Sequence, residues 1–194
     1  MAFINQNYKT VKVKLLLLFV SINLIGYSQT VDFQLQADGT FKNNEEPKDY
    51  TVIEYEGKSR EDLYSEILIG VTRLYNSPKD VISKVENEII SVNGISTNCV
   101  TLKGMMGVRV NFSIQYVIQF QFKEGKIRVD APVISRLFTD DTPDIKPFSG
   151  WLKVQNVFKK GKPNKQETIN DFNNTLNGLI NNILKGKTTT DEDW

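Results

Sequence analysis

The feature that most constrains this fold is a strict alternation of apolar and polar residues over positions 108–122. Every even-numbered position there is apolar, and every odd-numbered position except Val117 is polar. Because successive side chains of a β-strand point to opposite faces, the pattern predicts one long strand with one buried and one wet face. An antiparallel sheet built around this strand is therefore the expected basis of the fold.

A hairpin is predicted directly after the long strand. Residues 124–125 (Glu-Gly) form a two-residue turn in which glycine tolerates a positive φ. In the register that this turn sets, the core-facing residues of one strand pair with the core-facing residues of the other. On the wet face Gln121 meets Arg128, and Gln119 meets Asp130. A slip of one residue would destroy this match, so the register is well specified.

The polar face of the long strand is the candidate interaction surface. Its residues are Arg109, Asn111, Ser113, Gln115, Gln119 and Gln121. Such a row can donate and accept hydrogen bonds to an extended polymer or to another protein. It contains no activated acid, base or nucleophile. The alternative interpretation is a sheet face that is merely solvated.

Two amphipathic helices are predicted beside the sheet. The first begins at Ser59, which forms a capping box with Asp62, and it ends before Pro78. Its apolar stripe favours a core-facing helix, with a partner-binding helix as the alternative. The second begins in a capping box at Asn164 and ends at Gly186. Asparagines occupy the face opposite its apolar stripe.

The other segments divide the chain into parts. Residues 29–48 are interpreted as an exposed lead-in with at most one edge strand, and residues 49–138 as an α+β domain. Within that domain, residues 93–94 (Asn-Gly) favour a hairpin turn. Residues 139–185 form a loop-rich extension that ends in the second helix. Residues 186–194 form a polar tail.

Residues 1–28 have the pattern of a secretory signal peptide. Lysines precede an apolar core that starts at Leu15, and the small residues Gly26 and Ser28 form the exit. An uncleaved anchor is the alternative, but the apolar stretch is shorter than the roughly 20 residues that span a bilayer. We therefore expect an exported protein, periplasmic or extracellular, with no stable membrane span after cleavage.

Composition excludes several kinds of chemistry. The chain has no histidine, which removes Ser-His-Asp catalysis, Cys-His catalysis and histidine-ligated metals. Its one cysteine, Cys99, is interpreted as a small buried hydrophobe. The formal charge of +1 becomes slightly negative without residues 1–28, so nothing favours nucleic acid as a partner. We predict no catalytic residue, no metal ligand, no cofactor-binding residue and no cofactor.

Two patterns resemble binding motifs but fail in detail. Residues 57–59 (Gly-Lys-Ser) lack the upstream glycine of a phosphate loop, because Val52 stands in its place, and they are interpreted as a turn and a helix cap. Asp140, Asp141 and Asp144 form an acidic loop of the kind that binds calcium in exported proteins. The order of EF-hand ligands is missing, which favours a solvated loop.

Residues 50–136 also resemble a known family. Residues 52–59 (Val-Ile-Glu-Tyr-Glu-Gly-Lys-Ser), followed by Leu-Tyr at 63–64, are similar to its first strand, turn and helix. Residues 74–78 are similar to its helix exit, and residues 122–128 to its final hairpin. The family is a bacterial secreted domain of unknown function with a TATA-binding-protein-like fold. The resemblance implies a curved antiparallel sheet with helices on one face. It implies no catalytic or ligand residues, and shape alone does not transfer DNA binding.

The predicted fold class is therefore α+β, with a curved antiparallel sheet, helices packed on one face and a C-terminal amphipathic helix. The favoured function is that of a non-enzymatic binding or interaction module of the cell envelope. Its partner would be an envelope protein, a polymer or a small ligand. The alternative is a carboxylate-dependent hydrolase acting on envelope glycans, because two acidic side chains could meet in a cleft.

The signal-peptide interpretation predicts that the exported protein begins at Gln29. The small residues at positions 26 and 28 place the cut after Ser28. N-terminal sequencing of the exported form checks this expectation. Recovery of a chain that still carries Met1 from the membrane fraction would contradict it.

Overall fold

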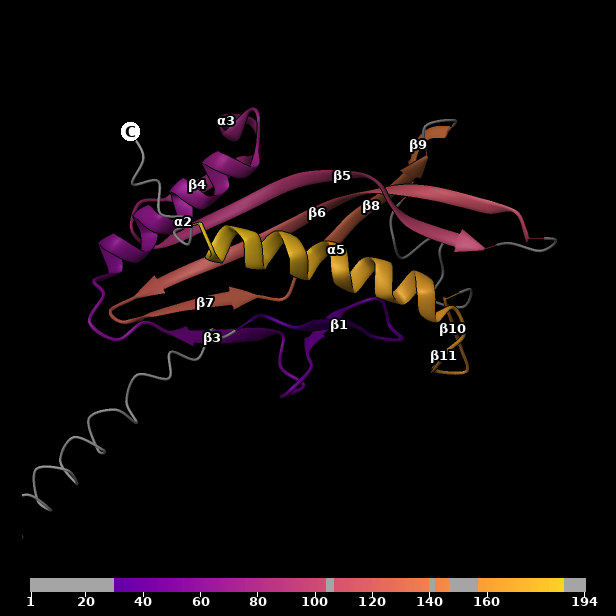
Figure 1. Cartoon of the computed structure of the whole chain (residues 1–194), viewed down its shortest axis with the longest axis horizontal. Coiled ribbons are helices and arrows are strands. Elements are labelled where there is room, and N and C mark those ends of the chain that lie inside the picture. Colours follow the sequence, from indigo (N-terminus) through magenta and orange to yellow (C-terminus); the bar gives the residue numbers. More distant parts are fainter. Residues whose placement is uncertain (1–29, 104–106, 140–141, 147–156, 187–194) are drawn as a thin grey trace, which may run out of the picture. The chain divides into compact units, whose positions relative to one another are not determined.

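The computed structural model describes residues 30–103, 107–139, 142–146 and 157–186, and its main feature is a seven-stranded antiparallel sheet (Figure 1). The strand order is β3–β7–β6–β5–β4, and β8 pairs with both β6 and β9. The strands are β3 (Tyr50–Glu54), β4 (Ile82–Val85), β5 (Ile89–Lys103), β6 (Arg109–Lys123), β7 (Lys126–Asp130), β8 (Val133–Thr139) and β9 (Thr142–Lys146). The short strands β10 (Phe158–Lys159) and β11 (Lys162–Pro163) form a separate pair. The predicted signal peptide, the tail beyond residue 186 and the acidic pair at 140–141 lie outside the described residues.

Strand β6 lies at the centre of the sheet and has the predicted facing over most of its length. One edge pairs with β5, while the other pairs with β7 at one end and β8 at the other. Its even-numbered residues from 112 to 122 are buried. The hairpin to β7 has the predicted register, because Gln121 pairs with Arg128. Gly125 supplies the positive φ of the turn, at +68°.

Two predictions about this sheet are wrong. Val108 and Val110 are exposed. Val108 precedes β6, and Val110 lies beyond the point where the pairing with β5 shifts register across residues 96–100. Residues 93–94 form no turn and lie inside β5. Gly94 is needed there for another reason, since a Cβ at this position would lie 2.4 Å from the hydroxyl oxygen of Tyr116.

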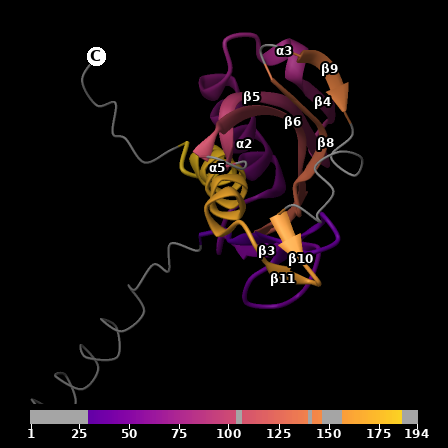
Figure 2. The same ribbon diagram turned by 90° about the vertical axis from the view of Figure 1, so that its right-hand side faces the viewer.

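Helices α2 (Arg60–Leu74) and α5 (Gln166–Leu184) cover one face of the sheet, and β5, β6 and β8 arch around them (Figure 2). The predicted curved antiparallel sheet with helices on one face is therefore confirmed. Helix α2 begins as predicted, because the Ser59 hydroxyl accepts a hydrogen bond from the Asp62 backbone N–H at 3.1 Å. The capping box predicted at Asn164 is wrong, because Lys165 is the N-cap residue of α5 and makes no side-chain capping bond.

The two helices cross in close contact. A Cβ added at Gly70 of α2 would lie 2.3 Å from the carbonyl oxygen of Ile183 on α5, so only glycine fits at this crossing. The short helix α3 (Pro78–Val81) follows α2 and leads into β4. Within the described residues, no helix combines the length and the apolar character that crossing a bilayer requires.

The prediction of an exposed lead-in over residues 29–48 is wrong. Strands β1 (Phe33–Leu35) and β2 (Phe41–Asn43) form a hairpin there, and β1 contacts α5. Val31 and the side chains of Phe33, Leu35 and Phe41 are buried in the core. The alternation at the start of this segment therefore marks a strand of the core. Its contact with α5 is not evident from the sequence.

Three asparagines of α5 bind the backbone of β1 and its flanking residue: Asn173, Asn177 and Asn181. The Asn177 side chain accepts from the Phe33 N–H at 2.8 Å and donates to the Phe33 carbonyl at 2.9 Å. Asn181 does the same for Val31, and Asn173 accepts from the Leu35 N–H. Four residues of helix rise about 6.0 Å and two residues of strand about 6.6 Å, so the amides match the strand spacing. We call these three residues the asparagine ladder.

The ladder predicts different effects on stability for two asparagines of the same helix. Asn177→Ala should lower the free energy of unfolding by about 1–2 kcal/mol, because it leaves both backbone groups of Phe33 unpaired in a half-buried place. Asn174 is exposed, so Asn174→Ala should be neutral or slightly stabilising, since alanine is the better helix former. Urea denaturation measures both variants. Equal losses for the two would contradict the ladder.

Candidate functional site

The sheet face opposite the helices carries a row of side chains that crosses five strands. The strand register places them side by side in the order Val85, Ile89, Gln121, Arg128 and Val52. The row is apolar at both ends and polar in the middle. At about 4.8 Å between neighbouring strands it extends for roughly 19 Å. We call this surface the open face.

Asp130 is the centre of a polar network beside this row. One carboxylate oxygen accepts from the side-chain amides of Gln119 at 2.9 Å and Gln121 at 2.8 Å. The other accepts from Nε of Arg128 at 2.6 Å. Charge-assisted hydrogen bonds of this kind are among the stronger ones in proteins. The network therefore fixes the orientation of three side chains that all belong to the β6–β7 hairpin.

Tyr50 holds the arginine from the neighbouring strand. The guanidinium carbon of Arg128 lies 4.2 Å from the centre of the Tyr50 ring. A cation over an aromatic face is attracted by the electron density of the ring. Because Tyr50 pairs with Asp130 across β3 and β7, the ring and the carboxylate hold the arginine together.

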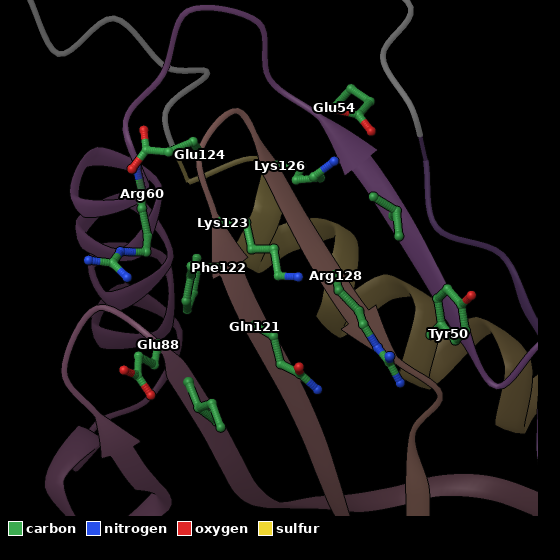
Figure 3. Close-up of a pocket in the computed structure, with 12 residues that line it drawn as sticks. Tyr50, Glu54, Arg60, Glu88, Gln121, Phe122, Lys123, Glu124, Lys126 and Arg128 are labelled. Carbon is green, nitrogen blue, oxygen red and sulfur yellow. The ribbon is translucent and has the colours of Figure 1, made fainter.

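A second row at the hairpin end contains Lys123, Lys126 and Glu54, which the register places directly opposite one another. This second row and the first row without Val85 line a depression of about 1,100 Å³. Figure 3 shows the two lysines, Gln121 and Arg128 on the strands, with α5 behind the sheet. Arg60, Glu88 and Glu124 stand at its other side, near the start of α2 and the turn before β5.

The predicted polar row of β6 is not continuous in the structure. Gln119 and Gln121 belong to the Asp130 network. Ser113 is fully buried and accepts a hydrogen bond from the Asn98 backbone N–H at 3.0 Å, so it is not available to a ligand. Asn98 belongs to the bulge in β5, so the bulge is what covers Ser113. Of the rest of the predicted row, Arg109 and Asn111 lie beyond the bulge, and Gln115 pairs with Ile95 just before it.

Sequence reasoning missed most residues of the depression. The signal that could have found them was the hairpin register, which already placed Arg128 beside Gln121 and Asp130 beside Gln119. The same register makes Lys123 and Lys126 neighbours, although a row read along one strand does not reveal it. Tyr50 could not be found in this way, because its pairing with β7 is long-range.

Other candidate residues have structural roles. Ser59 caps α2, and Lys58 makes an ion pair with Glu66 at 2.6 Å, as expected for a turn and a helix cap. Burial raises the pKa of the half-buried Cys99 thiol, which suppresses the reactive thiolate. Burial and a hydrogen bond to Tyr116 raise the pKa of Tyr75 in the same way. Among the described residues there is no group of acids and cysteine that could hold a metal ion.

Comparisons with known proteins identify the fold and leave the function open. No family model matches the chain, and no curated protein matches it. A solved DUF4468 family protein from Bacteroides ovatus is similar, with a TM-score of 0.52, 14% identity, and coverage of 73% of this chain and 86% of that one. A solved TBP-like protein from Parabacteroides distasonis gives a TM-score of 0.49 and 12% identity over 71% of this chain and 89% of its own.

The chain has the fold of an uncharacterised bacterial domain. The family resemblance over residues 50–136 is thus confirmed at the level of the fold. Identities this low carry no information about the open face, so its chemistry follows from the residues of this chain.

The Asp130 network predicts a measurable coupling between Asp130 and Arg128. Either alanine substitution should lower the free energy of unfolding by about 1 kcal/mol, because the pair is only partly buried. In a double-mutant cycle the two should couple by about 0.2–1 kcal/mol, and the coupling should shrink as salt is added. Urea denaturation at low and high ionic strength measures it. Strict additivity would show that the network does not hold Arg128.

Proposed function

We propose that this protein is an exported, non-enzymatic binding module that contacts a component of the cell envelope through its open face. The observation that carries the proposal is that four large apolar side chains of this face are exposed in the described chain. They are Val52 (41%), Val85 (53%), Ile95 (55%) and Val133 (59%). Contiguous apolar side chains rimmed by polar ones mark interaction surfaces, and Val85 on this face is the cross-strand neighbour of the apolar Ile89.

The polar part of the face supports the same interpretation. The Asp130 network holds Gln121 and Arg128 in fixed positions between the apolar ends of the row. A ligand that binds there does not have to order these side chains, which lowers the entropic cost of binding. Export rests on the predicted signal peptide, and an exported protein, periplasmic or extracellular, can reach components of the envelope.

The hydrolase alternative has less support. Glu54, Glu88 and Glu124 line the depression, but all three are exposed. A general acid needs an environment that keeps its carboxyl protonated, such as an apolar pocket. These side chains lack such burial. Nucleic acid is also disfavoured, because the formal charge without the signal peptide is slightly negative.

The test is sedimentation of the purified protein with envelope fractions of the source cells. Val52→Asp combined with Val85→Asp places charge at both apolar ends of the row, and should lower binding roughly tenfold or more. Ile69→Asp is the matched control, because Ile69 is similarly exposed (49%) but lies on α2. Circular dichroism checks folding.

Three outcomes would contradict the proposal. One is a folded double variant that still sediments like the unaltered protein. Another is an equal loss in Ile69→Asp, and the third is an unaltered protein that does not bind envelope material. Turnover of an envelope glycan that is lost on replacing one of the three glutamates would establish the hydrolase instead.

A further inference from the structure

We propose that the depression on the open face takes a ligand with clustered anionic groups, either carboxylates or phosphates, at Lys123, Lys126 and Arg128. The inference rests on the proposed binding function and names the chemistry of the ligand. Three observations carry it: two lysines opposite each other, an arginine held with unused donors, and a spacing of the cations that suits a small polyanion.

The first observation is the lysine pair. Lys123 and Lys126 are direct cross-strand neighbours at the end of the β6–β7 hairpin, and both line the depression. Like charges in this position destabilise a hairpin. Within the described part of the chain neither lysine makes an ion pair, even though Glu54 is the cross-strand neighbour of Lys126. An anion between the two ammonium groups would turn this repulsion into attraction.

The second observation is the state of Arg128. Its Nε–H is used by Asp130, and its guanidinium lies over the Tyr50 ring. Its two terminal nitrogens make no hydrogen bond within the described residues, and the side chain is 42% exposed. A planar guanidinium with free N–H groups is suited to bidentate recognition of carboxylate or phosphate. Asp130 and Tyr50 are therefore positioning residues for the guanidinium group of Arg128.

The third observation is the spacing of the cations. Cross-strand neighbours have Cβ atoms about 4.5–5.5 Å apart, and residues two apart on one strand lie about 6.6 Å apart. The cationic heads therefore suit a ligand whose anionic groups are several ångströms apart. Gln121 donates its amide N–H to Asp130, so its carbonyl oxygen is left to accept from a ligand hydroxyl.

Cations outnumber acids in the lining of the depression, because Arg60, Lys123, Lys126 and Arg128 stand against Glu54, Glu88 and Glu124. Arg60 forms an ion pair with Glu61, outside the depression. Glu124 accepts a hydrogen bond from the Arg60 backbone N–H at 3.4 Å, which directs it toward the start of α2. Glu54 and Glu88 come from the flanking strand β3 and from the turn before β5. The lysines and Arg128 thus share the floor of the depression between β6 and β7.

The experiment is isothermal titration of the full chain with citrate and with pyrophosphate at constant ionic strength. At least one of these anions should bind. Lys123→Gln with Lys126→Gln should weaken binding roughly tenfold or more, because two charge-assisted contacts are lost. Lys84→Gln with Lys159→Gln removes the same charge from two exposed lysines elsewhere and should leave binding unchanged. Arg128→Lys keeps the positive charge but loses the planar pair of N–H donors, and should weaken binding several-fold.

Thermal unfolding gives an independent readout. Without any anion, the Lys123→Gln, Lys126→Gln variant should be as stable as the unaltered protein or more stable, because the repulsion is gone. Citrate or pyrophosphate should raise the Tm of the unaltered protein and not of this variant. The anion that binds more tightly distinguishes a carboxylate ligand from a phosphate ligand.

Several results would overturn the inference. They are the absence of binding by both anions, equal weakening in the Lys84, Lys159 control, and undiminished binding by the Lys123, Lys126 variant. Each leaves the sedimentation test of the proposed function intact, because that test uses the apolar ends Val52 and Val85. Failure of the sedimentation test would reject the open face itself, whereas failure of the anion titration would reject only its selectivity for anions.

Discussion

The alternating faces of β6 are the constraint on which both the core and the open face depend. Its two edges are hydrogen-bonded to β5, β7 and β8, so the strand cannot shift without breaking all three pairings. A shift of one residue would bring Phe120 to the open face and Gln121 into the core. Because one register fixes both faces, the burial that stabilises the fold also holds the polar network in place.

Local signals explain what could be predicted from the sequence. The β6–β7 hairpin was predictable because its turn is two residues long, its glycine has the required φ, and its alternation has one consistent register. The start of α2 was predictable because Ser59 bonds to a backbone group only three residues away. The central residues of the open face follow from the same hairpin, since Gln121 and Arg128 face each other in it.

Long-range contacts explain what could not be predicted. The bond between Val31 and Asn181 joins positions 150 residues apart, and no local pattern pairs a strand edge with a helix. The sequence did show asparagines on one face of α5, but it did not show that their amides would satisfy the backbone of β1. The hairpin turn predicted at residues 93–94 failed for a related reason. Asn-Gly favours such a turn, but Gly94 lies inside a strand and makes room for the Tyr116 hydroxyl.

The core face of the sheet determines the fold, whereas the open face would determine the ligand. Similarity in fold therefore does not identify the ligand. A chain only 14% identical keeps this architecture, which shows how many side chains can change while the layers are retained. Residues of the open face contribute little to the core, so they can vary without loss of the fold. Lys123 and Lys126 illustrate the point, because a hairpin under selection for stability alone would not place two positive charges opposite each other. The proposed anionic ligand gives a reason for this pair of lysines in the lining of the depression, and the fold alone gives none.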